Sequence, residues 1–292
     1  MDRKNSEEGL SEVIGFILIL ALIMVFLSIW VIYAVPADGR QQEIEHMDYV
    51  QDWFTQYKIT ADSLWINYNA TDQTGPSGIT ISNSLVLGSQ GGATYSQGLF
   101  MIFMRPFGSS GTLSIENRSE KIEIRNDSMT LLDEEMMCVQ YDGSNTYWIP
   151  QTYYYQMGGV FLEQSDGTVN RVAPLVYFYS FDGLDVARFV ITNITLGQTE
   201  TTSISGEGPV RIDTVLTGKT ELQPAPEGEG YTINMTLRDD SAAKAWMSIL
   251  NELGAPDVDR VNNELTISGI DIIQYQYVNY TVSLQSVAAS FN

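Results

Sequence analysis

The sequence predicts a mainly β protein whose strands follow a transmembrane helix and an amphipathic stalk helix. Two observations predict this class: an uninterrupted apolar segment, and a hydrophobic period that changes from helical spacing to alternation after Ile79. The expected organisation is a short cytoplasmic leader (1–9), a transmembrane helix (10–35), an amphipathic stalk helix (36–66), a linker (67–78) and a β-sandwich-like extracytoplasmic domain (79–292) with one inserted α-helix.

The apolar segment Val13–Val35 contains no charged residue. As a helix it would be about 35 Å long, which is enough to cross a hydrocarbon core of about 30 Å. Trp30 and Tyr33 lie near its end, where aromatic rings favour the lipid–water boundary, and Pro36 ends the run. A cleaved secretory signal ending at VPA, before Asp38, is the alternative, although the run is about twice as long as such signals require. We therefore expect a retained anchor that contacts membrane lipid.

The following segment carries one apolar seam, whose members recur at alternating spacings of three and four, as on an amphipathic helix. These seam residues are Met47, Val50, Phe54, Tyr57, Ala61 and Leu64. The seam could pack on the chain's own β domain or against helices of neighbouring subunits. Charged residues such as Glu43 and Lys58 fall off the seam, and His46, beside it, is expected to lie on the helix surface.

From Ile79 onward, apolar and polar residues alternate as in half-buried strands. The alternating segments on either side of ENRSEK (116–121) are predicted to form a hairpin, and the continuously apolar segment 175–181 is predicted to be a buried strand. An amphipathic helix is expected after Asp239 or Asp240, either of which can cap it, and should end at Gly254. Such a helix within a series of strands should lie on one face or edge of a sheet.

Composition excludes several functional classes. The net charge is −21, from 36 acidic and 15 basic residues, which is incompatible with nucleic-acid binding through a basic face. The single histidine, His46, and the single cysteine, Cys138, cannot build a zinc cluster or an intrachain disulfide, and a histidine-dependent catalytic triad is not expected. Cys138 has apolar neighbours and is expected to be buried. We expect no enzyme activity, cofactor or metal.

Two sequence features concern carbohydrate: a cluster of tyrosines that could bind a sugar, and a set of sequons that could carry N-linked glycans. The tyrosines of TYYYQ (152–156) could form a sugar-binding platform, but burial within the sheet is the preferred interpretation. Six Asn-x-Ser/Thr sequons are either N-glycosylation sites of an extracytoplasmic domain or ordinary surface asparagines of a Thr-rich β protein. These asparagines are Asn69, Asn117, Asn126, Asn193, Asn234 and Asn279.

The N-terminus carries a family resemblance. Gly9 followed by LSEVIGFILILALI resembles the N-terminal class of archaeal type IV pilin-like proteins, in which a short leader ending in Gly precedes a hydrophobic helix. The continuation through VP (35–36), EIEH and VQDW is similar to an uncharacterised family of archaeal surface proteins. The resemblance implies leader cleavage between Gly9 and Leu10, although Glu7 and Glu8 stand where this class usually has a basic residue.

Together, these features predict a non-enzymatic surface protein with a single membrane pass. Its N-terminus is expected in the cytoplasm and its β domain, with the six sequons, outside the cell. The first hypothesis is a pilin-like structural or minor pilin subunit, whose partners are like subunits or other pilin-like proteins. The alternative is a lone anchored ectodomain that binds a surface partner or glycan.

Overall fold

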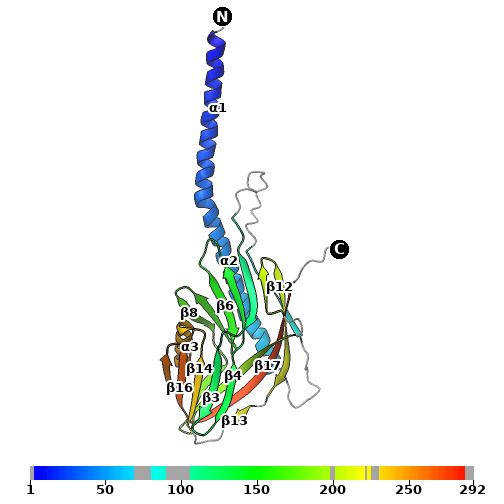
Figure 1. The fold of residues 1–292 in the computed structure, drawn as a ribbon, viewed down its shortest axis with the longest axis vertical. Coiled ribbons are helices and arrows are strands. Elements are labelled where there is room, and N and C mark those ends of the chain that lie inside the picture. The colour runs from blue at the N-terminus through cyan, green and yellow to red at the C-terminus, as the bar shows by residue number, and fades with distance from the viewer. Residues whose placement is uncertain are drawn as a thin grey trace.

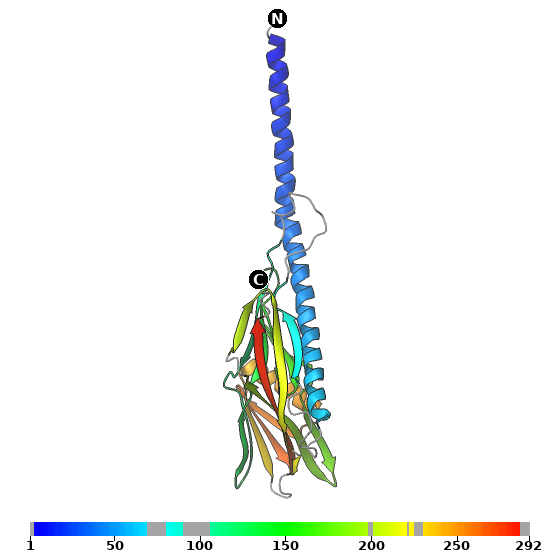
Figure 2. The ribbon, with the colours of Figure 1, turned by 90° about the vertical axis from the view of Figure 1, so that its right-hand side faces the viewer.

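A long N-terminal helix projects from a β-rich body (Figures 1 and 2). The computed structural model describes residues 3–68, 80–89, 106–197, 201–220, 222–224 and 230–286. The prediction of a mainly β chain with a long apolar helix at its N-terminus is confirmed. Asn69 and most of the expected linker lie outside the described residues.

The projecting helix is one continuous rod made of α1 (Arg3–Ile29), a π-helical turn η1 (Trp30–Ala34) and α2 (Val35–Ile66). The backbone N–H of Val35 donates to the carbonyl of Trp30, five residues back. This wider turn lies directly before Pro36, whose ring and missing N–H do not fit a regular helical turn. The helix therefore passes the proline without ending.

The described strands form three sheets, with the following strand orders. Sheet A contains β1 (Thr80–Val86), β12 (Pro209–Lys219), β17 (Ile272–Ser286), β10 (Leu184–Leu196) and β9 (Val176–Phe181), with β13 (Gln223–Pro224) also paired to β17. Sheet B contains β11 (Ser203–Gly206), β2 (Ser110–Glu116), β5 (Cys138–Ser144), β6 (Gln151–Gln156), β7 (Gly159–Gln164) and β8 (Gly167–Val172). Sheet C contains β15 (Asp257–Val261), β16 (Glu264–Ile270), β14 (Tyr231–Thr236), β3 (Lys121–Asn126) and β4 (Thr130–Glu135). The long strands β10 and β17 pair in parallel.

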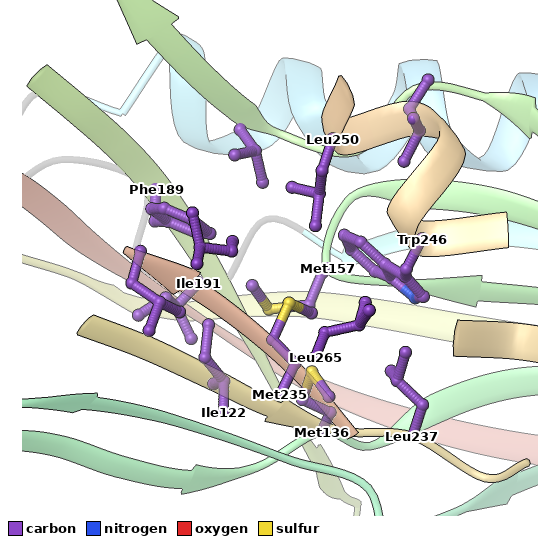
Figure 3. Close-up of a cluster of buried hydrophobic side chains, with 14 of the residues drawn as sticks. Ile122, Met136, Met157, Phe189, Ile191, Met235, Leu237, Trp246, Leu250 and Leu265 are labelled. Atoms are coloured by element: carbon purple, nitrogen blue, oxygen red, sulfur yellow. The ribbon is translucent and has the colours of Figure 1, made fainter. Parts of the chain in front are cut away.

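Two hydrophobic cores share these sheets. In the first, α2 packs against β1 and β12 of sheet A and β6 and β7 of sheet B. The second joins sheet C and the helix α3 (Asp240–Glu252) to the opposite faces of sheets A and B, and Figure 3 shows part of it. Because successive side chains of a strand point to opposite faces, β6 sends Tyr154 into the second core and its neighbours Tyr153 and Tyr155 into the first.

The inserted helix α3 begins and ends as its sequence indicates. Of the two candidate caps, Asp239 accepts the N–H of Ala242 at 2.8 Å. At the other end Gly254 adopts φ +84°, and the N–H of Ala255 donates to the carbonyl of Leu250, which completes a Schellman motif. Trp246 is fully buried, with its ring centroid 5.1 Å from that of Phe161.

The predicted hairpin around 116–121 is wrong. Strand β2 pairs with β5 and β11 in sheet B, whereas β3 pairs with β4 and β14 in sheet C. Ile115 consequently lies in the core around α2 and Ile122 in the other core. Alternation reveals which side chains of a strand are buried, but it carries no information about which strand lies next to it.

The prediction of a buried strand at 175–181 is also wrong for most of its residues. Strand β9 forms one edge of sheet A, and its residues Tyr177, Tyr179 and Phe181 are exposed. Phe178 and Val176 face the second core instead. The strand is therefore packed on one face only, although both faces carry apolar side chains.

Candidate membrane anchor and helix junction

The segment Val13–Val35 of the helical rod is apolar on all sides and is exposed among the residues that the structure describes. Between Glu12 and Ile66 lies one helix long and apolar enough to cross a membrane, and none of its most apolar window is buried. Leu22, for example, is 73% exposed. A contiguous apolar surface of this extent indicates contact with lipid or with another protein.

The second half of the rod is embedded in the β body. All six seam residues, from Met47 to Leu64, are buried in the core between sheets A and B. The hydroxyl groups of Tyr57 and Thr214 lie 3.0 Å apart, and Tyr280 Oη donates to the carbonyl of Ala61 at 2.8 Å. The chain's own domain thus covers the seam, and the exposed apolar part of the rod is Val13–Val35.

Glu43 ties the start of α2 to the loop between β5 and β6. Its carboxylate is fully buried and accepts three backbone N–H groups, from Thr146 and Tyr147 at 2.7 Å and from Trp148 at 2.6 Å. Glu43 is not one of the seam residues, yet it is as fully buried as they are. The loop covers this flank of the helix, and three amides satisfy the carboxylate in place of water.

The same loop contacts α2 one turn earlier. Gly39 is buried, and a Cβ at this position would lie 2.5 Å from the ring of Tyr147 and 2.9 Å from Pro106. The guanidinium of Arg40 lies 4.3 Å from the centre of the Trp148 ring. Together with Glu43, these contacts form the helix junction, where the exposed rod enters the β body.

His46 extends the junction into the core. It is buried rather than on the helix surface as predicted, with Nε2 lying 3.2 Å from the carbonyl oxygen of Leu87 and 3.1 Å from Tyr141 Oη. The hydroxyl of Tyr141 also donates to the Leu87 carbonyl. Burial lowers the pKa of His46 below its usual value, and the Leu87 hydrogen bond offsets part of this effect.

A second buried charge, Arg238, lies between sheets B and C. Its guanidinium pairs with Glu120, donates to Gln140 at 2.9 Å and lies 3.8 Å from the centre of the Tyr154 ring. Gln156 donates to the same Glu120 carboxylate at 2.8 Å. Sequence reasoning missed this cluster, because its members come from distant segments and form no local motif.

The aromatic cluster at 153–155 is buried, so it does not form a sugar-binding platform.

Cys138 is a buried free thiol, and burial raises its pKa to about 12, so it is poorly suited to act as a nucleophile. Within the described ranges, no group of three His, Cys, Asp or Glu side chains could hold a metal ion.

The five described sequon asparagines are all partly exposed. Asn117 and Asn126 lie at strand ends where their side-chain oxygens accept backbone N–H groups, and Asn234 accepts from Thr266. Asn193 and Asn279 lie side by side in register on β10 and β17. At the leader, the backbone is helical through Gly9 and Leu10.

Comparison with known proteins gives no assignment. No protein-family model, curated protein or solved structure matches this chain.

Proposed function

We propose that this chain is a membrane-anchored surface protein, in which the helix Val13–Val35 crosses the bilayer once and the β body stands outside the cell. The observation that carries the proposal is the contrast within one continuous rod: its segment Val13–Val35 is apolar and exposed, and its second half is built into the core of the body. Lipid is the environment in which both halves are stable, because it removes the exposed apolar surface from water.

The rod has no flexible joint where it enters the body. The Glu43 contacts and the Gly39–Tyr147 approach lie within two helical turns of Pro36. An anchor joined in this way holds the β body at a fixed orientation to the membrane. Fixed orientation favours a role in which position matters, namely a pilin-like structural or minor pilin subunit that packs its exposed helix against like helices.

Topology can be tested with introduced cysteines, because the native Cys138 is buried and should stay silent towards a thiol reagent. Ser165, at an exposed turn between β7 and β8, suits labelling from outside. In intact cells that express the full chain, we expect a membrane-impermeant maleimide to label Ser165→Cys. On chains that keep the leader, we expect it to label Ser6→Cys only after permeabilisation. Labelling of Ser165→Cys only after permeabilisation would overturn the outside assignment.

Assembly depends on the leader. Arg3, Lys4, Glu7 and Glu8 would be drawn into a helical filament core, where unpaired charges are strongly unfavourable. We therefore expect a filament subunit to be cut between Gly9 and Leu10. N-terminal sequencing of the native protein tests this expectation, and its intact mass reports glycosylation of the sequons in the same sample.

The second candidate is a lone anchored ectodomain that binds a surface partner or glycan. It is favoured by the burial of the seam, because a body that covers its own seam needs no neighbouring subunit to be stable. A native chain that still begins at Met1 or Asp2 would make this the better account.

A further inference from the structure

One face of sheet A becomes exposed beyond the end of α2. Along β10, Val190 and Ile194 lie in the core around α2, and alternation places Arg188 on the same face. Arg188 is directly opposite Tyr177 on the edge strand β9. Tyr177 and Tyr179 are 50% and 45% exposed, so this end of the face is largely uncovered by the residues that the structure describes.

A second cation, Lys219, lies near this end of the face. Lys219, on β12, donates to the Trp65 carbonyl at 2.9 Å, and its Nζ lies 5.2 Å from the centre of the Trp65 ring. Its pKa is lowered by partial burial and by the nearby positive charge of Arg188. Neither cation forms an ion pair with a carboxylate in the part of the chain that the structure describes. Two cations without such a pair among the described residues are unusual in a chain with 36 acidic and 15 basic residues.

Two hydrogen-bond donors of the same region also lack acceptors. Arg188 Nε and Trp65 Nε1 are buried and have no hydrogen-bond partner among the described residues. Buried donors without acceptors cost free energy comparable to a lost hydrogen bond, so they are rare unless a bound group supplies the acceptor. An oxygen-rich anion bound at this place would supply the acceptors that these donors lack among the described residues.

The aromatic side chains add an apolar surface to this site. Tyr177 and Tyr179 are two residues apart on β9, so both side chains project from the same face of the sheet. Tyr179 Oη donates to Gln274 Oε1 at 3.3 Å, which leaves the amide NH₂ of Gln274 as a further donor. Aromatic rings beside donors suit a ligand that has both apolar C–H faces and oxygen acceptors.

We propose that this face, carried by Tyr177, Tyr179, Arg188, Lys219 and Trp65, binds an acidic saccharide. The sugar rings lie on the tyrosines, and the carboxylate or sulfate group of the saccharide is bound by Arg188 and Lys219. A peptide added to the outer edge of β9 would pair with backbone groups there and would not need these donors. They lie inward from the edge, on β10, β12 and the end of α2, so the occupant must extend across the face.

The binding experiment uses the full chain in detergent micelles, so its result does not depend on the membrane topology proposed above. The probes are tri-galacturonic acid, which carries carboxylates, and a chondroitin sulfate tetrasaccharide, which carries both carboxylates and sulfates. Calorimetric titration is expected to show binding of at least one probe. Methyl-esterified tri-galacturonic acid and a hexaglutamate peptide serve as the ligand controls, and both are expected to bind at least about tenfold more weakly, a difference that calorimetry resolves.

Two variants test the residues. Arg188→Gln and Tyr177→Ala are each expected to weaken binding about tenfold or more, whereas Arg118→Gln, which removes an exposed arginine at the β2–β3 turn, should leave it unchanged. If Arg188→Gln does not fold, Lys219→Gln takes its place. Absence of binding by the unmodified chain, equal binding of the methyl ester, or equal binding of hexaglutamate each overturns the proposal.

Discussion

The carboxylate of Glu43 accepts the backbone N–H of Trp148 at 2.6 Å, although the two residues are more than a hundred positions apart. With the amides of Thr146 and Tyr147, this bond fixes the β5–β6 loop to the first turns of α2. The contact lies where the exposed rod becomes a core helix, so it determines how the body is held on its anchor.

Removal of the Glu43 charge should loosen the junction. In Glu43→Gln one oxygen becomes an NH₂ group that cannot accept, so at least one buried amide loses its partner. We expect a loss of about 2–4 kcal/mol in the free energy of unfolding of the full chain in micelles. Hydrogen exchange at the amides of 146–148 should accelerate. Glu45→Gln, an exposed neighbour, is the control and should change stability by no more than about 0.5 kcal/mol.

Truncation of the seam should destabilise the body itself. Phe54 is fully buried, with its ring centroid 6.0 Å from that of Tyr153, whereas Ile59 on the same helix is 56% exposed. We expect Phe54→Ala to cost about 3–5 kcal/mol and Ile59→Ala no more than about 0.5 kcal/mol, measured by denaturant unfolding. Equal, small effects would show that α2 does not share a core with the sheets.

The buried Arg238–Glu120 pair should be sensitive to loss of either partner. Glu120→Gln removes the fully buried counter-charge of Arg238 and leaves only the longer ion pair with Glu163 at 3.4 Å, so we expect a loss of about 3–5 kcal/mol. Glu116→Gln, which breaks the exposed pair with Arg118, should cost at most about 1 kcal/mol. The two variants and the unmodified chain are compared by thermal unfolding. Similar unfolding midpoints for the two variants would contradict the prediction.

His46 should make the body less stable in acid. Its pKa is lower in the folded chain than in the unfolded chain, so the unfolded state binds a proton first as the pH falls. His46 is therefore expected to destabilise the fold as the pH falls from about 7 through the unfolded value near 6.5 and further to the lowered folded pKa. Below the folded pKa, the loss of stability that His46 causes reaches its full value.

Carboxylates also titrate in acid, so the His46 contribution must be measured as a difference. The free energy of unfolding is compared between the unmodified chain and His46→Gln across this pH range. The difference in free energy of unfolding between the two proteins should become smaller in acid, because glutamine in the variant cannot take up the proton. A gap that stays constant would show that His46 has the same pKa in both states.

Some features of this chain follow from residues that are close together in the sequence. Val13–Val35 is a long exposed helix because every side chain in it is uncharged, and the seam from Met47 to Leu64 is buried because one helix face collects its apolar residues. The boundaries of α3 follow in the same way from Asp239 and Gly254. Such patterns depend on local geometry, so a reader of the sequence alone can predict them.

Other features were decided by contacts between distant segments. Glu43 and His46 carry surface-type side chains, and they are buried because a loop and strands from residues 87 and 141–148 cover them. Tyr177 and Tyr179 look like core residues, and they are exposed because β9 is the edge of its sheet. Alternation and helical period specify which face of an element is apolar. The partner that covers each face is chosen by the packing of the whole chain, and that choice fixed both the helix junction and the saccharide face.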